Sequence, residues 1–411
     1  MASRFLQLHF LTSYPSALLN RDDAGFAKRI PFGGVTRTRI SSQCLKRHWR
    51  TFDGEFSLRA LSAPGSIRSR LTFERFVLAP LLEDGVTEKL ARAVTKALME
   101  EVLGKSEKAK KTQQDGDKKT KGSSAAEAEP AEGMRTGQIT VLGRPEVEYF
   151  LQQARELCAA APAPEEAAQL LKERLGKEGK ENLKKLRCAA GLDGALFGRM
   201  VTADILARGD AAVHVAHAFT VHAEAPESDY FSAVDDLLQT DEGEQLGSGH
   251  IGTTELMSGL FYGYLVVDLP LLVSNLEACP TEDWLAADRA LAADVVDRLV
   301  HLVATVSPGA KLGSTAPYAY AHLILAESSN AQPRTLANAF LKPVVEQPDV
   351  VLSAYRALQR HVLELDAMYG APGKRCVAGI GPVEELTSGL SVERASALAG
   401  FAAWARQRVL D

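Results

Sequence analysis

The sequence predicts an α+β fold built on a ferredoxin-like sheet that a long helical excursion interrupts. Apolar and polar side chains alternate over residues 4–12, which indicates an opening strand. Residues 55–190 are rich in Ala, Leu, Glu and Lys, a composition typical of helices. Later segments resemble a strand, a helix and a second strand, at 260–267, 291–306 and 318–325. This order of elements is compatible with such a sheet.

Several connecting segments complete the predicted organisation. A helix begins at Ser41 or Ser42, since either hydroxyl can cap it. Residues 104–136 contain Met134 and alanines but no other aliphatic or aromatic side chain, so we expect a disordered insertion there. The strand-like run 213–223 suggests an extended hairpin. Two helices are expected at the end of the sequence, near 350–368 and 391–409.

Composition excludes several classes of protein. The five cysteines of the 411-residue chain are scattered without a CxxC pair, which indicates neither a disulfide framework nor a zinc site. The most apolar stretch, 260–273, is broken by Asp268 and Pro270 and is too short to span a bilayer. We therefore expect a cytoplasmic protein without a membrane partner.

Positive charge is concentrated in one segment, although the chain as a whole has a formal net charge of −5. Residues 20–50 contain only two acids, Asp22 and Asp23, beside eight cations: Arg21, Lys28, Arg29, Arg37, Arg39, Lys46, Arg47 and Arg50. A basic segment on an acidic body is typical of a local phosphate-binding surface. The alternative is a charged loop that is merely solvated.

The helix after Ser42 places its polar side chains in a stripe. Four of them recur at i, i+3, i+4 and i+7, namely Gln43, Lys46, Arg47 and Arg50. Leu45 and Trp49 mark the opposing face. The stripe covers roughly 10 Å of helix and begins at an N-terminus whose backbone N–H groups favour anions. This geometry suits a phosphate chain better than a compact substrate, although a plain surface helix would have the same pattern.

Motifs for catalysis and cofactors are weak. The segment GSGHIG (247–252) matches GxGxxG, but the acidic sequence before it and the glycine-broken sequence after it do not predict the strand and helix that a dinucleotide site needs. Four histidines, His214, His217, His222 and His250, have no Cys or carboxylate at ligand spacing. GxSxG, HExxH and Walker A sequences are absent from the chain. We predict neither a metal nor a cofactor.

Three apolar side chains could contact nucleobases. Tyr230 and Phe231 are adjacent between acidic loops and could supply a stacking surface, and Met200 could act as a wedge. Composition alone does not separate this interpretation from a role as core side chains.

Three passages carry a resemblance to a known family. They are LNRDDAGFAKRIPFGGVTRTRISSQCLKRHWR (19–50), GRMVTADI with HVAHAFTVH (198–222), and DYFSAVDDL with GSGHIGTTELMSGLFYGY (229–264). They resemble the strongest blocks of the CasC family, the repeated backbone subunit of the type I-E CRISPR surveillance complex Cascade. The segments 307–322 and 336–340 follow in the expected order, so the resemblance covers nearly all of the chain except 104–136.

The resemblance implies a right-hand shape with an RRM-like palm, a helical fingers domain and a β-hairpin thumb. Its implied boundaries are 1–55 and 251–345 for the palm, 56–192 for the fingers with the insertion 104–136, 193–250 for the thumb, and 346–411 for C-terminal helices on the palm.

The resemblance also implies a function. Copies of a backbone subunit stack head to tail along a CRISPR RNA and bind other Cascade subunits, and target DNA pairs with the guide between thumbs. The side chains implied to bind RNA are Asn20, Arg21, Lys28, Ser41, Gln43, Lys46, Arg47, Arg50, Met200, Tyr230, Phe231 and His250. Cys44 and Tyr230 depart from the family pattern.

Two other functions remain as alternatives. An RNA-processing endonuclease on a similar sheet would need a general base near the basic segment, and His9 and His48 are the candidates. A nucleotide-dependent oxidoreductase would use GSGHIG. Against these alternatives, we expect a protein that binds RNA without catalysing a reaction.

Overall fold

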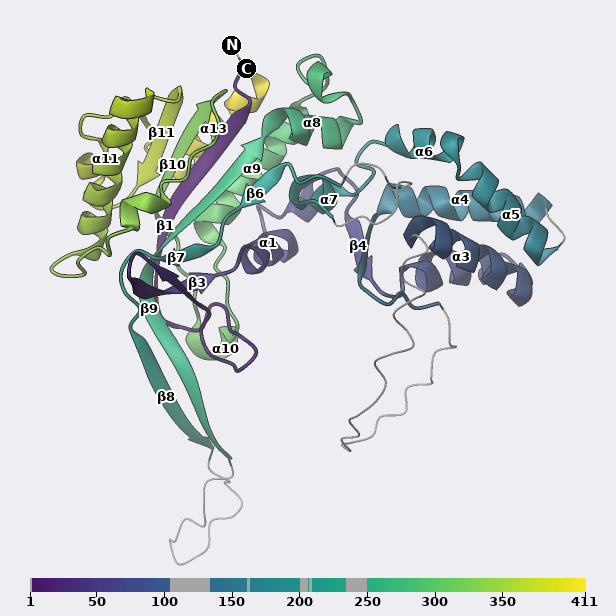
Figure 1. Cartoon of the computed structure of the whole chain (residues 1–411), viewed down its shortest axis with the longest axis horizontal. Helices are drawn as coiled ribbons and strands as arrows, with labels where there is room; N and C mark the ends of the chain where they lie inside the picture. Colours follow the sequence, from purple (N-terminus) through teal and green to yellow (C-terminus); the bar gives the residue numbers. More distant parts are fainter. Residues whose placement is uncertain (1, 104–133, 161–162, 200–205, 207–208, 234–249) are drawn as a thin grey trace, which may run out of the picture. The chain divides into compact units, whose positions relative to one another are not determined.

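The computed structural model describes residues 2–103, 134–160, 163–199, 206, 209–233 and 250–411 (Figure 1). The chain divides into two compact units. The sheet unit comprises Met1–Leu61, His214–Leu269 and Ala290–Asp411. The helical unit comprises Ser62–Val213 and Pro270–Arg289. The mixture of helices with a large sheet confirms the predicted α+β class.

A 10-stranded sheet forms the centre of the sheet unit, with the strand order β12-β11-β10-β1-β9-β7-β3-β2 and with β6 and β8 also paired to β9. Its strands are β1 (Phe5–Ala17), β2 (Arg29–Phe32), β3 (Val35–Ile40), β6 (Val213–Val215), β7 (Ala218–Thr220), β8 (Pro226–Ala233), β9 (His250–Asp268), β10 (Ala321–Ser329), β11 (Lys374–Gly379) and β12 (Glu393–Arg394). β1 lies between β9 and β10 and is antiparallel to both.

The central strand β1 is buried on both faces. Leu6 and Leu8 are fully buried, as the alternation predicts, but Gln7 and His9 on the other face are buried too. That second face is covered by α11 (Val350–Tyr369), whose Tyr355 and Leu358 join a cluster with Leu11. The sequence pattern therefore identified the strand but not the burial of its polar face.

The remaining helices of the sheet unit are α1 (Ser42–Thr51), η1 (Leu58–Ala60), α9 (Ala290–Thr305), α10 (Leu312–Thr315), η5 (Ala337–Phe340), α12 (Val383–Thr387) and α13 (Leu398–Leu410). α9 packs against α13 and also contacts β1 and β10. None of the described helices combines the length and the apolar character that crossing a membrane requires.

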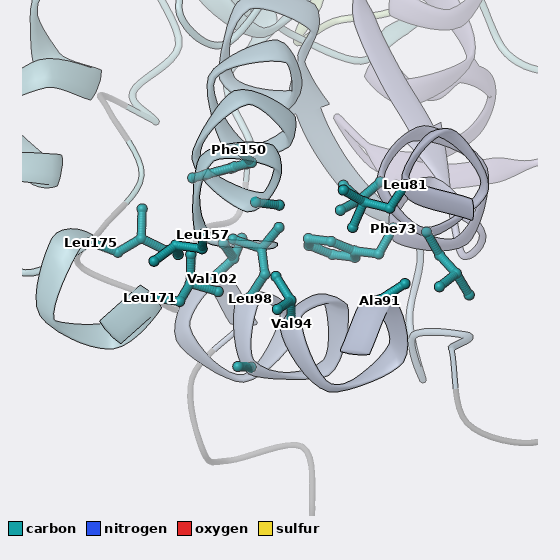
Figure 2. Packing of buried hydrophobic residues seen from close by; sticks show 14 of the residues in the cluster. Phe73, Leu81, Ala91, Val94, Leu98, Val102, Phe150, Leu157, Leu171 and Leu175 are labelled. Atoms are coloured by element: carbon teal, nitrogen blue, oxygen red, sulfur yellow. The ribbon is translucent and has the colours of Figure 1, made fainter. Parts of the chain in front are cut away.

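The helical unit packs around one apolar cluster, in which Phe73, Leu98 and Phe150 are almost completely buried (Figure 2). Its helices are η2 (Glu74–Leu78), α2 (Ala79–Glu83), α3 (Glu88–Leu103), α4 (Arg144–Ala160), α5 (Pro164–Arg174), α6 (Lys177–Lys184), α7 (Leu192–Phe197), η4 (Thr281–Asp283) and most of α8 (Leu269–Glu277). This helical content agrees with the prediction for 55–190, apart from a two-stranded sheet of β4 (Ser66–Ser69) and β5 (Thr140–Gly143).

Some predicted boundaries were wrong. Residues 104–133 of the predicted insertion lie outside the described residues, but Met134 belongs to the packed cluster of the helical unit and is 6% exposed. The run 213–223 forms two short strands that each pair with β9 rather than a hairpin of its own. The last helix begins at Leu398 instead of 391, because Glu393 and Arg394 form a parallel pairing with β11.

A cluster of ion pairs holds α11 and the segment after β10 against the sheet. Arg375 donates to Glu327 at 2.8 Å and to Asp366 at 2.6 Å, and Arg334 donates to the same two carboxylates. Burial by itself would raise the pKa of Asp366, but the hydrogen bonds and charges of the two guanidinium groups hold it below its usual range. The pKa of Glu327 also lies below its usual range, because His9 and Arg334 together outweigh the effect of burial, which would raise it.

Replacing Arg375 by Leu should therefore destabilise the sheet unit strongly. Glu327 is fully buried and Arg375 is 2% exposed, and removing one partner of such a buried pair costs about 3–5 kcal/mol. Both carboxyl pKa values lie below the unfolded values of about 4, so the stabilisation is present above that pH and disappears as the pH falls. Chemical unfolding should show that the variant has a much lower free energy of unfolding than the wild type at pH 7. The difference between the two free energies should be smaller at pH 3.

The matched control is Arg356→Leu, which removes an arginine of α11 from an ion pair with Glu385. The Arg356 side chain is 61% exposed, and such surface pairs contribute little to stability. Its unfolding curve should stay close to that of the wild type. Equal destabilisation by the two substitutions would contradict a special role for the buried cluster.

Candidate nucleic-acid interface

The start of α1 is fixed by two side chains from different segments. Ser41 is the N-cap, and its Oγ accepts a hydrogen bond from the Cys44 backbone N–H at 3.3 Å. Asn20 Oδ1 accepts from the Ser41 N–H at 2.9 Å. Ser41 is 6% exposed, so its position supports the helix rather than presenting a hydroxyl to solvent. Asn20 and Ser41 thus join the 20–28 loop to the helix that follows β3.

The two faces of α1 are arranged as the sequence predicts. Leu45 and Trp49 are buried at 4% and 1% exposure. The other side contains the predicted stripe, in which Gln43 and Arg47 are exposed and Lys46 and Arg50 are half-buried. An apolar face that packs inward therefore fixes the direction in which the cations point.

Of the eight cations in the basic segment, Arg29 and Arg37 have structural roles, and Arg39 also donates from its Nε to the Arg29 carbonyl at 3.2 Å. Arg29 forms ion pairs of 2.6 Å with Glu224 and with Glu255. Arg37 is fully buried, donates to three backbone carbonyls, and has its pKa lowered by burial. The other six are half-buried or exposed: Arg21, Lys28, Arg39, Lys46, Arg47 and Arg50. The basic surface is thus smaller than the sequence count suggests.

His217 lies within this basic surface and was not predicted there. Its Nδ1 accepts from the Ser42 backbone N–H at 3.1 Å and lies 3.4 Å from an Arg39 guanidinium nitrogen. Burial, together with the charges of Arg39 and Lys28, lowers the pKa of His217, so the imidazole is neutral. The contact also corrects the expectation for the helix N-terminus, because His217 and Ser41 already accept two of its first N–H groups.

A β-hairpin of β8 and β9 carries the predicted aromatic side chains. Tyr230 is opposite Thr253, and Phe231 is opposite Gly252. Because adjacent residues of a strand point to opposite faces, the two rings do not form one joint stacking surface as the sequence suggested. Tyr230 is 63% exposed and Phe231 is 41% exposed. Met200 and the His250 side chain lie outside the described part of the chain, although the His250 backbone pairs with Ala233.

The ring of Phe231 lies between a glycine and a lysine. A Cβ added at Gly252 would be 2.4 Å from Phe231 Cζ, so the ring lies directly over the glycine backbone. Lys311 Nζ lies 5.7 Å from the ring centre and donates to Thr254 Oγ1 at 2.6 Å. This distance is within the range of a cation–π interaction. Sequence reasoning missed Lys311, because no local pattern connects it to a hairpin 57 residues away.

The segment that carries Lys311 also contacts α1 and the residue that follows β1. The Gly309 N–H donates to His48 Nε2 at 3.4 Å, and the Ala310 N–H donates to the Leu18 carbonyl at 2.9 Å. β9 itself continues from the hairpin into the central sheet as one strand of 19 residues. The α1 stripe and the root of the hairpin are therefore positioned by the same unit.

The two histidines considered for catalysis are both engaged. His9 is 1% exposed, and its Nδ1 lies 2.9 Å from the Tyr262 hydroxyl. His48 donates from Nδ1 to the Cys44 carbonyl at 2.8 Å, and its Nε2 accepts from Gly309. Among the described residues, His9 Nε2 has no hydrogen-bond partner, and it lies 3.8 Å from the buried Glu327 carboxylate, inside the sheet unit rather than on its surface. The burial of Cys44 raises its pKa to about 11, so this thiol is not an activated nucleophile.

The glycine motif does not have the geometry of a dinucleotide site. Gly247 and Gly249 lie outside the described residues, but His250–Asp268 is a strand, whereas that site requires a helix after the glycines. Within the described ranges, no group of three or more His, Cys, Asp or Glu side chains could hold a metal ion.

Comparison with known proteins identifies the family. Residues 6–401 match the model of the family Cas_CT1975, described as CT1975-like protein. No curated protein matches the chain. A solved structure entitled "CRISPR RNA-guided surveillance complex, pre-nicking" is similar at 24% identity and a TM-score of 0.71, over 98% of this chain and 100% of that one.

A second solved structure, "CRISPR RNA-guided surveillance complex", is similar at 20% identity and a TM-score of 0.54, over 98% of each chain. At these identities the two structures establish a shared fold. The type I-E assignment stays a prediction, whereas the resemblance to a family of CRISPR-associated subunits is confirmed by the match to nearly the whole chain. The chain belongs to the CT1975-like family of CRISPR-associated proteins.

Proposed function

We propose that the chain is a non-catalytic backbone subunit that binds the phosphates of a CRISPR RNA and repeats head to tail along it. The observation that carries this proposal is the α1 stripe, in which the half-buried Lys46 and Arg50 lie on the helix face opposite the buried Leu45 and Trp49, in the same unit as Lys28 and Arg39. A guide RNA differs in sequence from one complex to the next, so a backbone subunit must contact phosphates and sugars rather than base edges.

The architecture is consistent with the palm, fingers and thumb that such a backbone subunit would have. The strand order β10-β1-β9-β7, with α1 between β1 and β7 in sequence and α9 between β9 and β10, is consistent with an RRM-like palm. The apolar cluster of the helical unit is consistent with a fingers domain. We infer a thumb whose second strand is β9, so that the thumb extends past residue 250.

In this proposal Arg21, Gln43 and Arg47 join Lys28, Lys46 and Arg50 as backbone contacts, while Asn20 and Ser41 hold the helix and the loop in place. Phe231, with Tyr230, Met200 and His250, acts on the bases from the thumb. The guide is thereby presented for pairing with target DNA, within an assembly that includes copies of this chain and other Cascade subunits. Both similar structures come from RNA-guided surveillance complexes, which is consistent with this role.

Removing the charges of Lys46 and Arg50 together tests the phosphate contacts. The two residues are four positions apart, roughly 6 Å along the helix, so each can reach its own phosphate. The double change to Ala should lower affinity about equally for unrelated guide sequences. The slope of log affinity against log salt should decrease by about 1.4, or about 0.7 per lost contact on a single strand.

The control variant is Lys342→Ala with Arg360→Ala, which removes the same charge from exposed positions of the same unit outside the basic surface. Its salt slope should equal that of the wild type, and thermal melting should show that both double variants are folded. A folded K46A/R50A protein with unchanged affinity and slope would rule out α1 as a phosphate-binding helix.

A second test concerns the thumb. Phe231→Ala should remove the regularly spaced reactive nucleotides that chemical probing detects along a bound guide, while the salt slope stays unchanged. Gly252→Ala should weaken the same pattern, because the new Cβ occupies the position of the Phe231 ring. Thr253→Ala is the control, since Thr253 is opposite Tyr230 instead. If Phe231→Ala leaves the pattern intact, the ring has no role in displacing bases.

A further inference from the structure

The 20–28 loop presents one aromatic side chain to solvent. Phe26 is 50% exposed, whereas Ala27 beside it is buried at 3%. Complete burial of a phenylalanine side chain is stabilising, so half-exposure forgoes a substantial part of that stabilisation. Some feature of the loop must therefore hold this ring in an exposed position.

Hydrogen bonds to Asp22 determine the conformation of the loop. Asp22 Oδ1 accepts from the N–H groups of Ala24 at 3.0 Å and Phe26 at 2.9 Å. The Asp22 N–H donates to the Phe26 carbonyl at 2.8 Å, and the Gly25 N–H donates to the Asp22 carbonyl at 3.2 Å. Gly25 has a φ of +94°, which favours glycine. The backbone of Phe26 is thus held at both its N–H and its carbonyl.

The base of the loop is also fixed. The Lys28 N–H donates to the Asn20 carbonyl at 2.9 Å, and Arg21 pairs with Ala27 in an antiparallel bridge. The Ala27 N–H donates to Glu255 of β9 at 3.1 Å. With its neighbour buried and its own backbone bonded, Phe26 is held on the outside of the loop, so its backbone would lose little freedom on contact with a ligand.

The charges around the ring indicate the chemistry of that ligand. Arg21 is exposed and Lys28 half-buried in the same loop, and the Asn20 side chain connects the loop to the N-cap of α1. Both acids of the loop, Asp22 and Asp23, are exposed, and Asp22 Oδ1 is engaged by two backbone N–H groups. An exposed aromatic ring in a loop that also carries cations is a combination that binds single-stranded nucleic acid, with cations on phosphates and the ring on a base.

We propose that Phe26 stacks on a nucleobase of the bound single strand, as a second base-contacting position separate from the thumb. The proposal rests on the proposed function, because Arg21 and Lys28 must hold the adjacent phosphates. Stacking does not discriminate between bases, so the contact is compatible with any guide sequence.

The test measures binding of the full-length chain to two strands, a uridine oligoribonucleotide and an abasic ribose-phosphate strand of equal length. Phe26→Ala should weaken binding to the uridine strand by about 5- to 150-fold, with an unchanged salt slope. It should leave binding to the abasic strand unchanged. Phe26→Trp should retain affinity, and Phe26→Leu, which keeps an apolar side chain without a π-face, should lose it. Tyr369→Ala, at an exposed aromatic residue at the end of α11, is the matched control.

Equal binding of both strands by wild type and Phe26→Ala would overturn the inference. Equal weakening on both strands would overturn it too, since the ring would then contact another copy of the chain or the sugar-phosphate backbone. The proposed function fails separately, if Lys46→Ala with Arg50→Ala leaves affinity for the uridine strand unchanged. If Phe26→Leu weakens binding to the uridine strand and Phe26→Trp does not, the aromatic face of the side chain is what binds the base.

Discussion

The hydrogen bond between Asn20 Oδ1 and the Ser41 backbone N–H, 2.9 Å long, is the interaction on which the proposed interface depends. It joins the end of the 20–28 loop to the N-cap of α1, and the cap itself satisfies the Cys44 N–H. Lys28 is then held beside the helix through its N–H bond to the Asn20 carbonyl. Together with the Arg39 N–H bond to the Lys28 carbonyl at 2.8 Å, this connection sets the spacing between the cations of the loop and those of α1, and a phosphate chain requires a fixed spacing.

The same basic segment serves both the fold and the surface. Arg37 joins three segments by donating hydrogen bonds to a backbone carbonyl of each. The charge of Arg29 is neutralised by two glutamates that come from distant parts of the chain. Two of the remaining cations, Arg39 and Lys28, lie near His217, whose pKa is lowered by burial and by their charge. A chain with a net charge of −5 can therefore still present a local positive surface.

Local sequence patterns predicted those features of the structure that depend only on neighbouring residues. The helical period placed Leu45 and Trp49 inside and the cations outside, because α1 is short and follows a clear cap. The roles of Arg29 and His217 depend on contacts across more than 170 residues, and no local pattern encodes them. The aromatic pair was misjudged for a related reason, since the pairing of β8 with β9 decides that Tyr230 and Phe231 face opposite sides. Phe26 was overlooked because its exposure results from the Asp22 hydrogen bonds, which sequence periodicity does not reveal.

In the proposed complex, RNA lies along α1, the 20–28 loop and the β8–β9 hairpin of the sheet unit. Ultraviolet cross-linking of the complex purified from cells that express a CRISPR array, followed by mass spectrometry of the cross-linked peptides, would locate the RNA. We expect cross-links to peptides that contain residues 20–28, 42–51 and 226–233. Cross-links confined to the helical unit, or a purified complex without RNA, would contradict this expectation.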